Sequence, residues 1–259
     1  MRDDEITDPK SNLDTSGDEL IEGLMERASV ALLRRGYFET VLFCQQALRL
    51  AVDAAAFDAA ARIVLPLQEA RRQIRQLAVD AAESAGVMVL RSLPNTPKPG
   101  CYVLEPPAIG IDASAFRNQA EAVEIPVFVL CREPTPQKGP HEGTIPLVGV
   151  GGVSVRAYVD RPDGSEDAPE TLNKVRLPDE LPLEWFEAAG EALGDAAIRS
   201  VPADDPAAWR VLDLMERLEA VPEHEKLHQR MADACRKAYR EPAPATPRRR
   251  SIADDPFSF

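Results

Sequence analysis

The chain has 259 residues, enough for one large domain or two modest ones around a buried core. It is 44% hydrophobic and 28% charged, which is typical of soluble globular proteins, and its formal net charge at pH 7 is -13. Surfaces that bind nucleic acid along its phosphates are built from Lys and Arg, so this acidic balance argues against a nucleic-acid partner.

The sequence predicts a cytoplasmic protein. The stretch MRDDEITDPKSNLDTSGDEL lacks the apolar core of a secretion signal. No apolar run approaches the ~20 residues that span a bilayer, so we expect no membrane partner. The cysteines have no C-x-x-C spacing and are interpreted as reduced, partly buried thiols at Cys44, Cys101, Cys131 and Cys235.

The N-terminal third is predicted to be helical after a disordered acidic tail at residues 1–17. In residues 18–85, apolar side chains recur at helical spacing in DELIEGLMERASVALLRRG and in YFETVLFCQQALRLAVDA, and Gly36 is expected to end the first helix. In FDAAARIVLPLQEARRQIRQLAVDAAESAG, Pro66 indicates either a kink in one helix or a break into two.

The segment RRGYFETVLFCQQALRLA resembles the turn, the aromatic residue and the second helix of a tetratricopeptide hairpin, over about residues 20–80. It departs from that family because the spacing from Gly36 to ALRL is one residue short, and because Thr40 or Val41 stands where the family usually has an alanine early in the second helix. No second full repeat follows. The resemblance implies either a structural helical layer or a groove that binds a protein partner.

Residues 86–162 are predicted to form a small α/β sheet domain. The runs VMVLRSL, CYVLEPP, IPVFVLCREP and IPLVGVGGVSVRAYVDRP are β-branched and punctuated by Pro and Gly, as strands are. Between the second and third runs, DASAFRNQAEAVE predicts a short helix capped by Asp112 or Ser114. This order favours a parallel βαβ unit. The glycines of GVGGVS are interpreted as a bulge or a closely packed strand, because strand sequence follows them.

Helices are expected to return after a polar linker at residues 163–181. The predicted C-terminal segment, residues 182–241, has three helices, with Pro206 and Pro222 in the first turns of the second and third. A disordered tail is expected at residues 242–259. The sequence therefore predicts an α+β (mixed α/β) protein with an N-terminal helical hairpin layer, a small central βαβ-containing sheet and C-terminal helices.

The string His224-Glu225-Lys226-Leu227-His228 fits the H-E-x-x-H pattern of zinc peptidases, whose histidines bind zinc and whose glutamate is the general base. The resemblance implies zinc on His224 and His228, with Glu225 as the catalytic base. The family's downstream third ligand has no counterpart, and only His141, in a loop, is left to complete the site. The alternative interpretation needs no cofactor. It places the histidines along the edge of a buried helical stripe of Leu227, Met231, Ala234 and Ala238.

A second candidate site would bind a small ligand. Arg132 and Glu133 directly follow an apolar strand, and Asp112 follows another apolar run. Polar groups at the carboxyl ends of parallel strands are where α/β folds bind ligands. The alternative is a cluster of salt bridges and caps that closes the edge of the sheet.

Two further features indicate contacts with a protein partner. Three arginines, Arg71, Arg72 and Arg75, lie close together on the third predicted helix, where they would contact an acidic partner or RNA. The alternative is an ordinary exposed helix face. The C-terminal ADDPFSF is loosely similar to the acidic peptide by which bacterial single-stranded-DNA-binding proteins recruit partners, although that family ends at the Pro-Phe. Phe257 and Phe259 would be its apolar anchors.

The leading hypothesis from sequence is a non-catalytic protein that binds other proteins. A zinc-dependent hydrolase and a small-ligand-binding domain are the alternatives. The sequence indicates neither the identity of the partner nor the oligomeric state.

Overall fold

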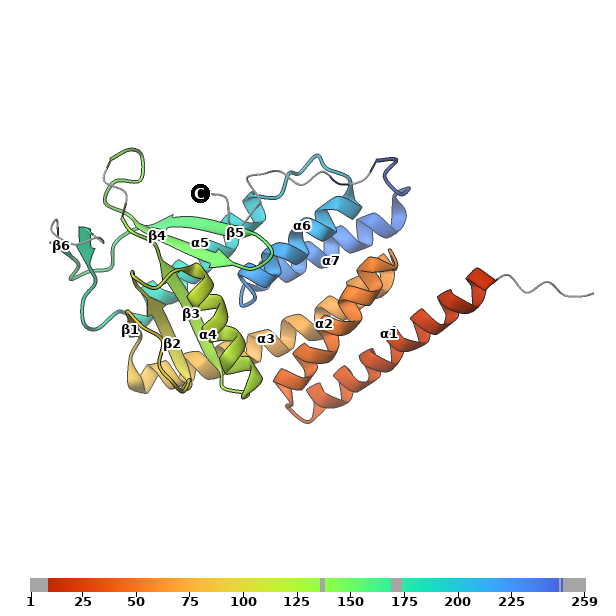
Figure 1. Cartoon of the computed structure of the whole chain (residues 1–259), viewed down its shortest axis with the longest axis horizontal. Helices are drawn as coiled ribbons and strands as arrows, with labels where there is room; N and C mark the ends of the chain where they lie inside the picture. The colour runs from red at the N-terminus through yellow and green to blue at the C-terminus, as the bar shows by residue number, and fades with distance from the viewer. Residues whose placement is uncertain (1–8, 136–137, 169–173, 247, 249–259) are drawn as a thin grey trace, which may run out of the picture.

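The computed structural model describes residues 9–135, 138–168, 174–246 and 248. A helical layer, a mixed β-sheet and a second group of helices follow one another along the chain (Figure 1). This confirms the predicted α+β class and its order of helices, sheet and helices. Within the described residues, no helix is long and apolar enough to cross a lipid bilayer.

Three helices form the N-terminal layer. They are α1 (Pro9–Leu33), α2 (Tyr37–Asp53) and α3 (Phe57–Ala85). α1 begins at Pro9, inside the segment that was expected to be a disordered tail. Proline suits the first turn of a helix, because its missing N–H has no helical partner there. Gly36 separates the first two helices, as predicted.

α3 is a single helix that continues through Pro66. Proline removes one backbone hydrogen bond and crowds the preceding turn, which normally kinks or ends a helix. Here Ile63, Val64 and Leu67 on either side of Pro66 are at most 1% exposed. The burial of both flanks offsets the cost of the proline, since most helical stability in a protein comes from packing.

The central sheet has five strands in the order β1-β2-β3-β4-β5. β1, β2 and β3 are parallel, whereas β4 and β5 pair antiparallel to their neighbours. The connection from β2 to β3 runs through helix α4 (Gly110–Ala122), which confirms the predicted βαβ unit. The strands are Met88–Leu90, Gly100–Leu104, Val127–Arg132, Ile145–Val150 and Ser154–Val159.

The middle strands β2, β3 and β4 are covered on both faces, which explains why they are continuous apolar runs. Successive side chains of a strand point to opposite faces. On one face, Val103 and Phe128 belong to the large core shared with α3 and α5 (Leu183–Arg199). On the other face, Tyr102 packs edge to face against Phe116 of α4, with ring centroids 5.1 Å apart.

Of the glycines of GVGGVS, Gly149 lies within a strand and is closely packed, since an added Cβ would lie 2.7 Å from the carbonyl oxygen of Ala220, as the prediction of a closely packed strand requires. Gly151 and Gly152 lie at a turn between two strands, where a bulge was the other prediction. β4 ends at Val150 and β5 begins at Ser154. The Gly151 N–H donates to the Val153 carbonyl over 3.0 Å. A Cβ added to Gly151 would lie 2.5 Å from the backbone nitrogen of Ala220. The turn needs a glycine there because the end of a helix packs directly on its backbone.

The C-terminal helices are α5, α6 (Ala207–Ala220) and α7 (Glu225–Arg240). α7 begins at Glu225 with His224 as its N-cap, so Pro222 precedes the helix instead of lying in its first turn. The predicted linker contains a two-stranded ladder, in which β6 (Glu166–Ala168) pairs antiparallel with β7 (Lys174–Arg176).

The two ends of the chain share one core. The stripe predicted for the last helix is buried, with Leu227, Met231, Ala234 and Ala238 at most 6% exposed. It belongs to the same hydrophobic cluster as residues of α1, α2 and α3. In the predicted disordered tail, the described residue Arg248 is ion-paired with Asp213 and Glu216 of α6. The C-terminal helices are therefore packed on both the sheet and the N-terminal layer.

Candidate functional site

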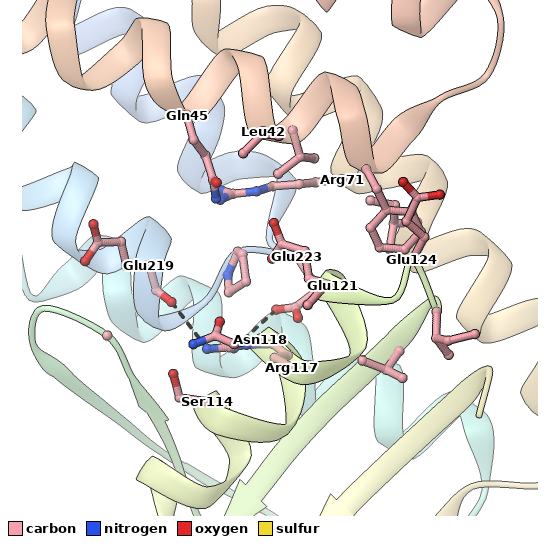
Figure 2. A pocket seen from close by; sticks show the side chains of 18 of the residues that line it. Leu42, Gln45, Arg71, Ser114, Arg117, Asn118, Glu121, Glu124, Glu219 and Glu223 are labelled. Carbon is pink, nitrogen blue, oxygen red and sulfur yellow. Dashed lines mark hydrogen bonds and ion pairs between the residues drawn. The ribbon is translucent and has the colours of Figure 1, made fainter. Parts of the chain in front are cut away.

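A cleft of about 850 Å³ lies between the N-terminal helical layer and the sheet domain. Its walls come from parts of the chain that are distant in sequence: residues 38–49, 71–74, 114–127 and 219–223, together with Gly151. Figure 2 shows Gln45 and Arg71 reaching over the cleft from the helical layer, with Arg117 and Asn118 on the opposite wall. We treat this cleft as the candidate functional site.

One part of the cleft is apolar. Leu42 projects from α2 and is 49% exposed, although the neighbouring Val41 is 3% exposed. Ile74 of α3 and Ile125, just before β3, also line the cleft. A half-exposed leucine beside other apolar groups is a feature that a binding partner can bury.

Arg117 joins two walls of the cleft. From α4, its guanidinium donates to the carbonyl of Ala220 over 3.1 Å and to that of Glu219 over 3.3 Å. Its Nη1 also lies 3.9 Å from a carboxylate oxygen of Glu223. The carbonyls at the end of a helix have no partner within the helix, so an arginine satisfies them well. Arg117 thereby fixes the turn between α6 and α7 against the sheet domain.

Arg71 and His228 connect the wall formed by the N-terminal helical layer to helix α7. The Nη1 of Arg71 donates a hydrogen bond to Nε2 of His228 over 3.2 Å. Since a guanidinium has no acceptor, His228 must present a lone pair at Nε2 and carry its proton on Nδ1. That proton is donated to the backbone carbonyl of His224, 3.0 Å away. Both imidazole nitrogens of His228 are therefore occupied.

His228 is neutral at physiological pH. Burial and, to a lesser extent, the positive charge of the neighbouring Arg71 together lower the pKa of its imidazole from 6.5 to about 3. Because the folded pKa lies below the unfolded one, the unfolded chain binds a proton that the folded chain does not between these pH values. The stability contributed by this group is complete above pH 6.5 and is lost as the pH falls toward 3.

We expect His228→Gln to make the protein less sensitive to mild acid. The glutamine amide oxygen can still accept from Arg71 but does not titrate. Between about pH 7 and about pH 5, the wild type should lose about 2 kcal/mol of unfolding free energy through His228, and the variant should lack this loss. Urea unfolding at both pH values measures it. An equal loss in both proteins would contradict a neutral, buried His228.

The two histidines of HEKLH face different helices. His224 is the N-cap of α7, and its Nε2 lies 3.4 Å from Glu191 and 3.5 Å from Asp195, both on α5. His228 faces α3, as described above. Glu225 is also turned to α3, where it accepts a 3.4 Å hydrogen bond from Gln68.

This arrangement does not fit one zinc ion held by both histidines. The Nε2 lone pair of His228 already accepts from a guanidinium, whose positive charge opposes a cation at the same place. His224 is 1% exposed, and a Cβ added to Gly194 would lie 2.0 Å from its ring. His141 stacks on Tyr158 of β5, with ring centroids 3.7 Å apart. No group of three or more potential metal ligands occurs among the described residues.

The three residues of the predicted ligand site make separate contacts. Asp112 lies in the first turn of α4 and accepts a 2.8 Å hydrogen bond from the Ile109 N–H. Glu133 forms a two-pronged ion pair with Arg156 of β5 near the surface. Arg132 is fully buried and is ion-paired with Glu105 over 2.5 Å. These contacts are one cap hydrogen bond and two ion pairs, as in the alternative to a ligand site that the sequence also offered.

The three arginines of α3 that were predicted to contact a partner also differ in their surroundings. Only Arg71 lines the cleft. Arg72 is exposed and pairs with Glu69 one turn earlier. Arg75 pairs with Glu187 and Glu191 of α5, and its guanidinium lies over the ring of Phe128. Phe257 and Phe259, the anchors predicted in the tail, lie outside the described residues.

Comparisons with family models, with curated proteins and with solved structures find no match for this chain. The site is therefore interpreted from its own residues.

Sequence reasoning missed the cleft as a site, although it singled out Arg71. The walls contain Leu42 of α2, Arg117 of α4 and Glu223 before α7, which no local pattern connects. One signal was available: Leu42 is an apolar residue beside the helical stripe that includes Val41, so the apolar surface of α2 is wider than one packed face requires.

Proposed function

We propose that this protein is a non-catalytic, cytoplasmic binding protein that holds an extended peptide segment of another protein in the cleft. The observation that carries the proposal is the cleft itself. It is large enough, at about 850 Å³, for several side chains, and it places the half-exposed Leu42 beside polar groups of both charge signs. Mixed apolar and hydrogen-bonding walls are typical of sites that recognise peptide segments.

The chemistry of the cysteines supports a binding role in a reducing compartment. All four are unpaired and buried. Burial raises the pKa of each thiol to about 12, so none is a thiolate near neutral pH. The resemblance of residues 20–80 to a tetratricopeptide hairpin supports the same proposal, because the helices that carry it form one wall of the cleft.

A selection of peptides from a random phage-displayed library tests the proposal. We expect the wild-type protein to enrich a set of related peptides. Leu42→Glu should abolish that enrichment, because it places a carboxylate in the apolar part of the cleft.

The matched control is Leu65→Glu. Leu65 lies on α3, is 51% exposed and does not line the cleft, so its substitution should leave the selected peptides unchanged. The proposal fails if the wild type enriches no related peptides, or if Leu42→Glu enriches the same set.

A further inference from the structure

Three arginines line the cleft, and two of them have carboxylate partners. Arg49 lies 3.7 Å from a carboxylate oxygen of Glu219, and Arg117 lies 3.9 Å from one of Glu223. Arg71 has no carboxylate within 4 Å among the residues that the structure describes, and its one hydrogen bond there goes to the neutral His228. Its positive charge is therefore not neutralised by a contacting group.

The position of Arg71 makes this charge costly. Desolvation by the surrounding protein lowers the pKa of its guanidinium, while the carboxylates of Glu121 and Glu223 act in the opposite direction from beyond contact distance. An arginine nevertheless remains protonated in proteins. A desolvated charge without a partner is unfavourable, and an anion that reached it would recover much of that cost.

The orientation of the Arg71 guanidinium is also fixed, and most of its donors remain for a ligand. It offers five N–H donors, and the hydrogen bond from Nη1 to His228 uses one and fixes its orientation. Since His228 stays neutral, it orients the arginine without neutralising it. Gln45, which reaches over the cleft from α2, adds an amide donor to the same wall (Figure 2).

The charges around Arg71 favour a carboxylate over a phosphate. Glu121, Glu124 and Glu223 all line the cleft. A phosphate group that carries up to two charges would be repelled by these carboxylates while only one uncompensated cation attracts it. A carboxylate has one charge and matches the planar fork of a single guanidinium.

We infer that Arg71, oriented by His228, binds a carboxylate of the peptide segment in the cleft, next to an apolar side chain that contacts Leu42. This inference rests on the proposed function and adds the chemical class of the occupant. The carboxylate belongs either to an acidic side chain or to the C-terminus of the partner.

Nuclear magnetic resonance of the arginine side chains tests this directly in the full chain. The first probe is N-acetyl-leucine, which resembles a C-terminal residue. The second is the α-amide of N-acetyl-glutamate, whose free side-chain carboxylate resembles that of an internal acidic residue. At least one of them should shift the Nε–Hε signal of Arg71. The uncharged N-acetyl-leucinamide should shift it far less, and inorganic phosphate should bind more weakly than the better carboxylate.

Two variants complete the test. Arg71→Gln should weaken binding of the better probe by about tenfold or more, as expected for a lost charge-assisted hydrogen bond. Arg72→Gln, on the exposed side of the same helix, should bind as the wild type does. The comparison of acid and amide on the wild type does not depend on how well a variant folds.

The inference is wrong if the Arg71 signal is unmoved by both carboxylates, or moves equally with the uncharged amide, or responds best to phosphate. These outcomes are separate from failure of the proposed function. Peptides that depend on Leu42 but bind Arg71→Gln as tightly as the wild type would leave the peptide-binding role standing and remove Arg71 from it.

Discussion

Glu105→Ala is expected to lower the free energy of unfolding by about 3–5 kcal/mol, because it removes the carboxylate that is ion-paired with the buried guanidinium of Arg132. Arg132 is fully buried, and its Nη1 donates to Glu105 over 2.5 Å. Its Nη2 donates to the Thr135 hydroxyl and to the Val175 carbonyl, so the ion pair also ties β3 to the segment that contains β7. Urea unfolding measures the loss.

Glu133→Ala is the matched control for this prediction. Glu133 directly follows Arg132 and also pairs with an arginine, but the side chain of its partner Arg156 is 46% exposed. A surface ion pair of this kind contributes at most about 1 kcal/mol. Similar losses in the two variants would contradict the structural role assigned to the buried pair.

Gly151→Ala is expected to lower the free energy of unfolding by about 2–3 kcal/mol and to distort the cleft. The new Cβ would lie 2.5 Å from the nitrogen of Ala220 and 2.6 Å from the carbonyl carbon of Glu219. Both are backbone atoms, so relief requires the end of α6 to move. Because Glu219 and Glu223 belong to the wall of the cleft, peptide binding should weaken together with stability.

The control for this glycine is Gly23→Ala on α1, where an added Cβ meets nothing within 4 Å. Alanine favours a helix over glycine by up to about 1 kcal/mol, so this change should be neutral or slightly stabilising. Thermal unfolding of both variants gives the comparison. An unchanged midpoint in Gly151→Ala would show that the turn and α6 do not pack as described.

The long helices and the βαβ unit were predictable because their signals are local. Apolar periodicity located α2, α5 and α7, and the order of strand, helix and strand predicted the parallel pairing of β2 with β3. Errors arose where tertiary packing overrides local preference. α3 stays helical at Pro66 because the residues on both sides of the proline are buried. The β4–β5 turn has glycines because it lies in close contact with the end of α6.

The histidines show why the site was harder to predict than the fold. Spacing alone places His224 and His228 on one helical face, but α7 begins only at Glu225. His224, as the N-cap, has extended backbone angles, and its ring turns toward α5. The start of a helix depends on capping and packing more than on composition, so a motif that spans it has no fixed geometry in sequence.

The most direct test of the central claim, that the cleft binds the partner, is to locate a selected peptide on the protein. Backbone amide signals of the isotope-labelled chain should be recorded with and without the peptide. We expect the changes to concentrate in residues 38–49, 114–125 and 219–223, with Arg71 among the side chains affected. Changes confined to α5 or to the β6–β7 ladder, with the cleft unaffected, would contradict the account.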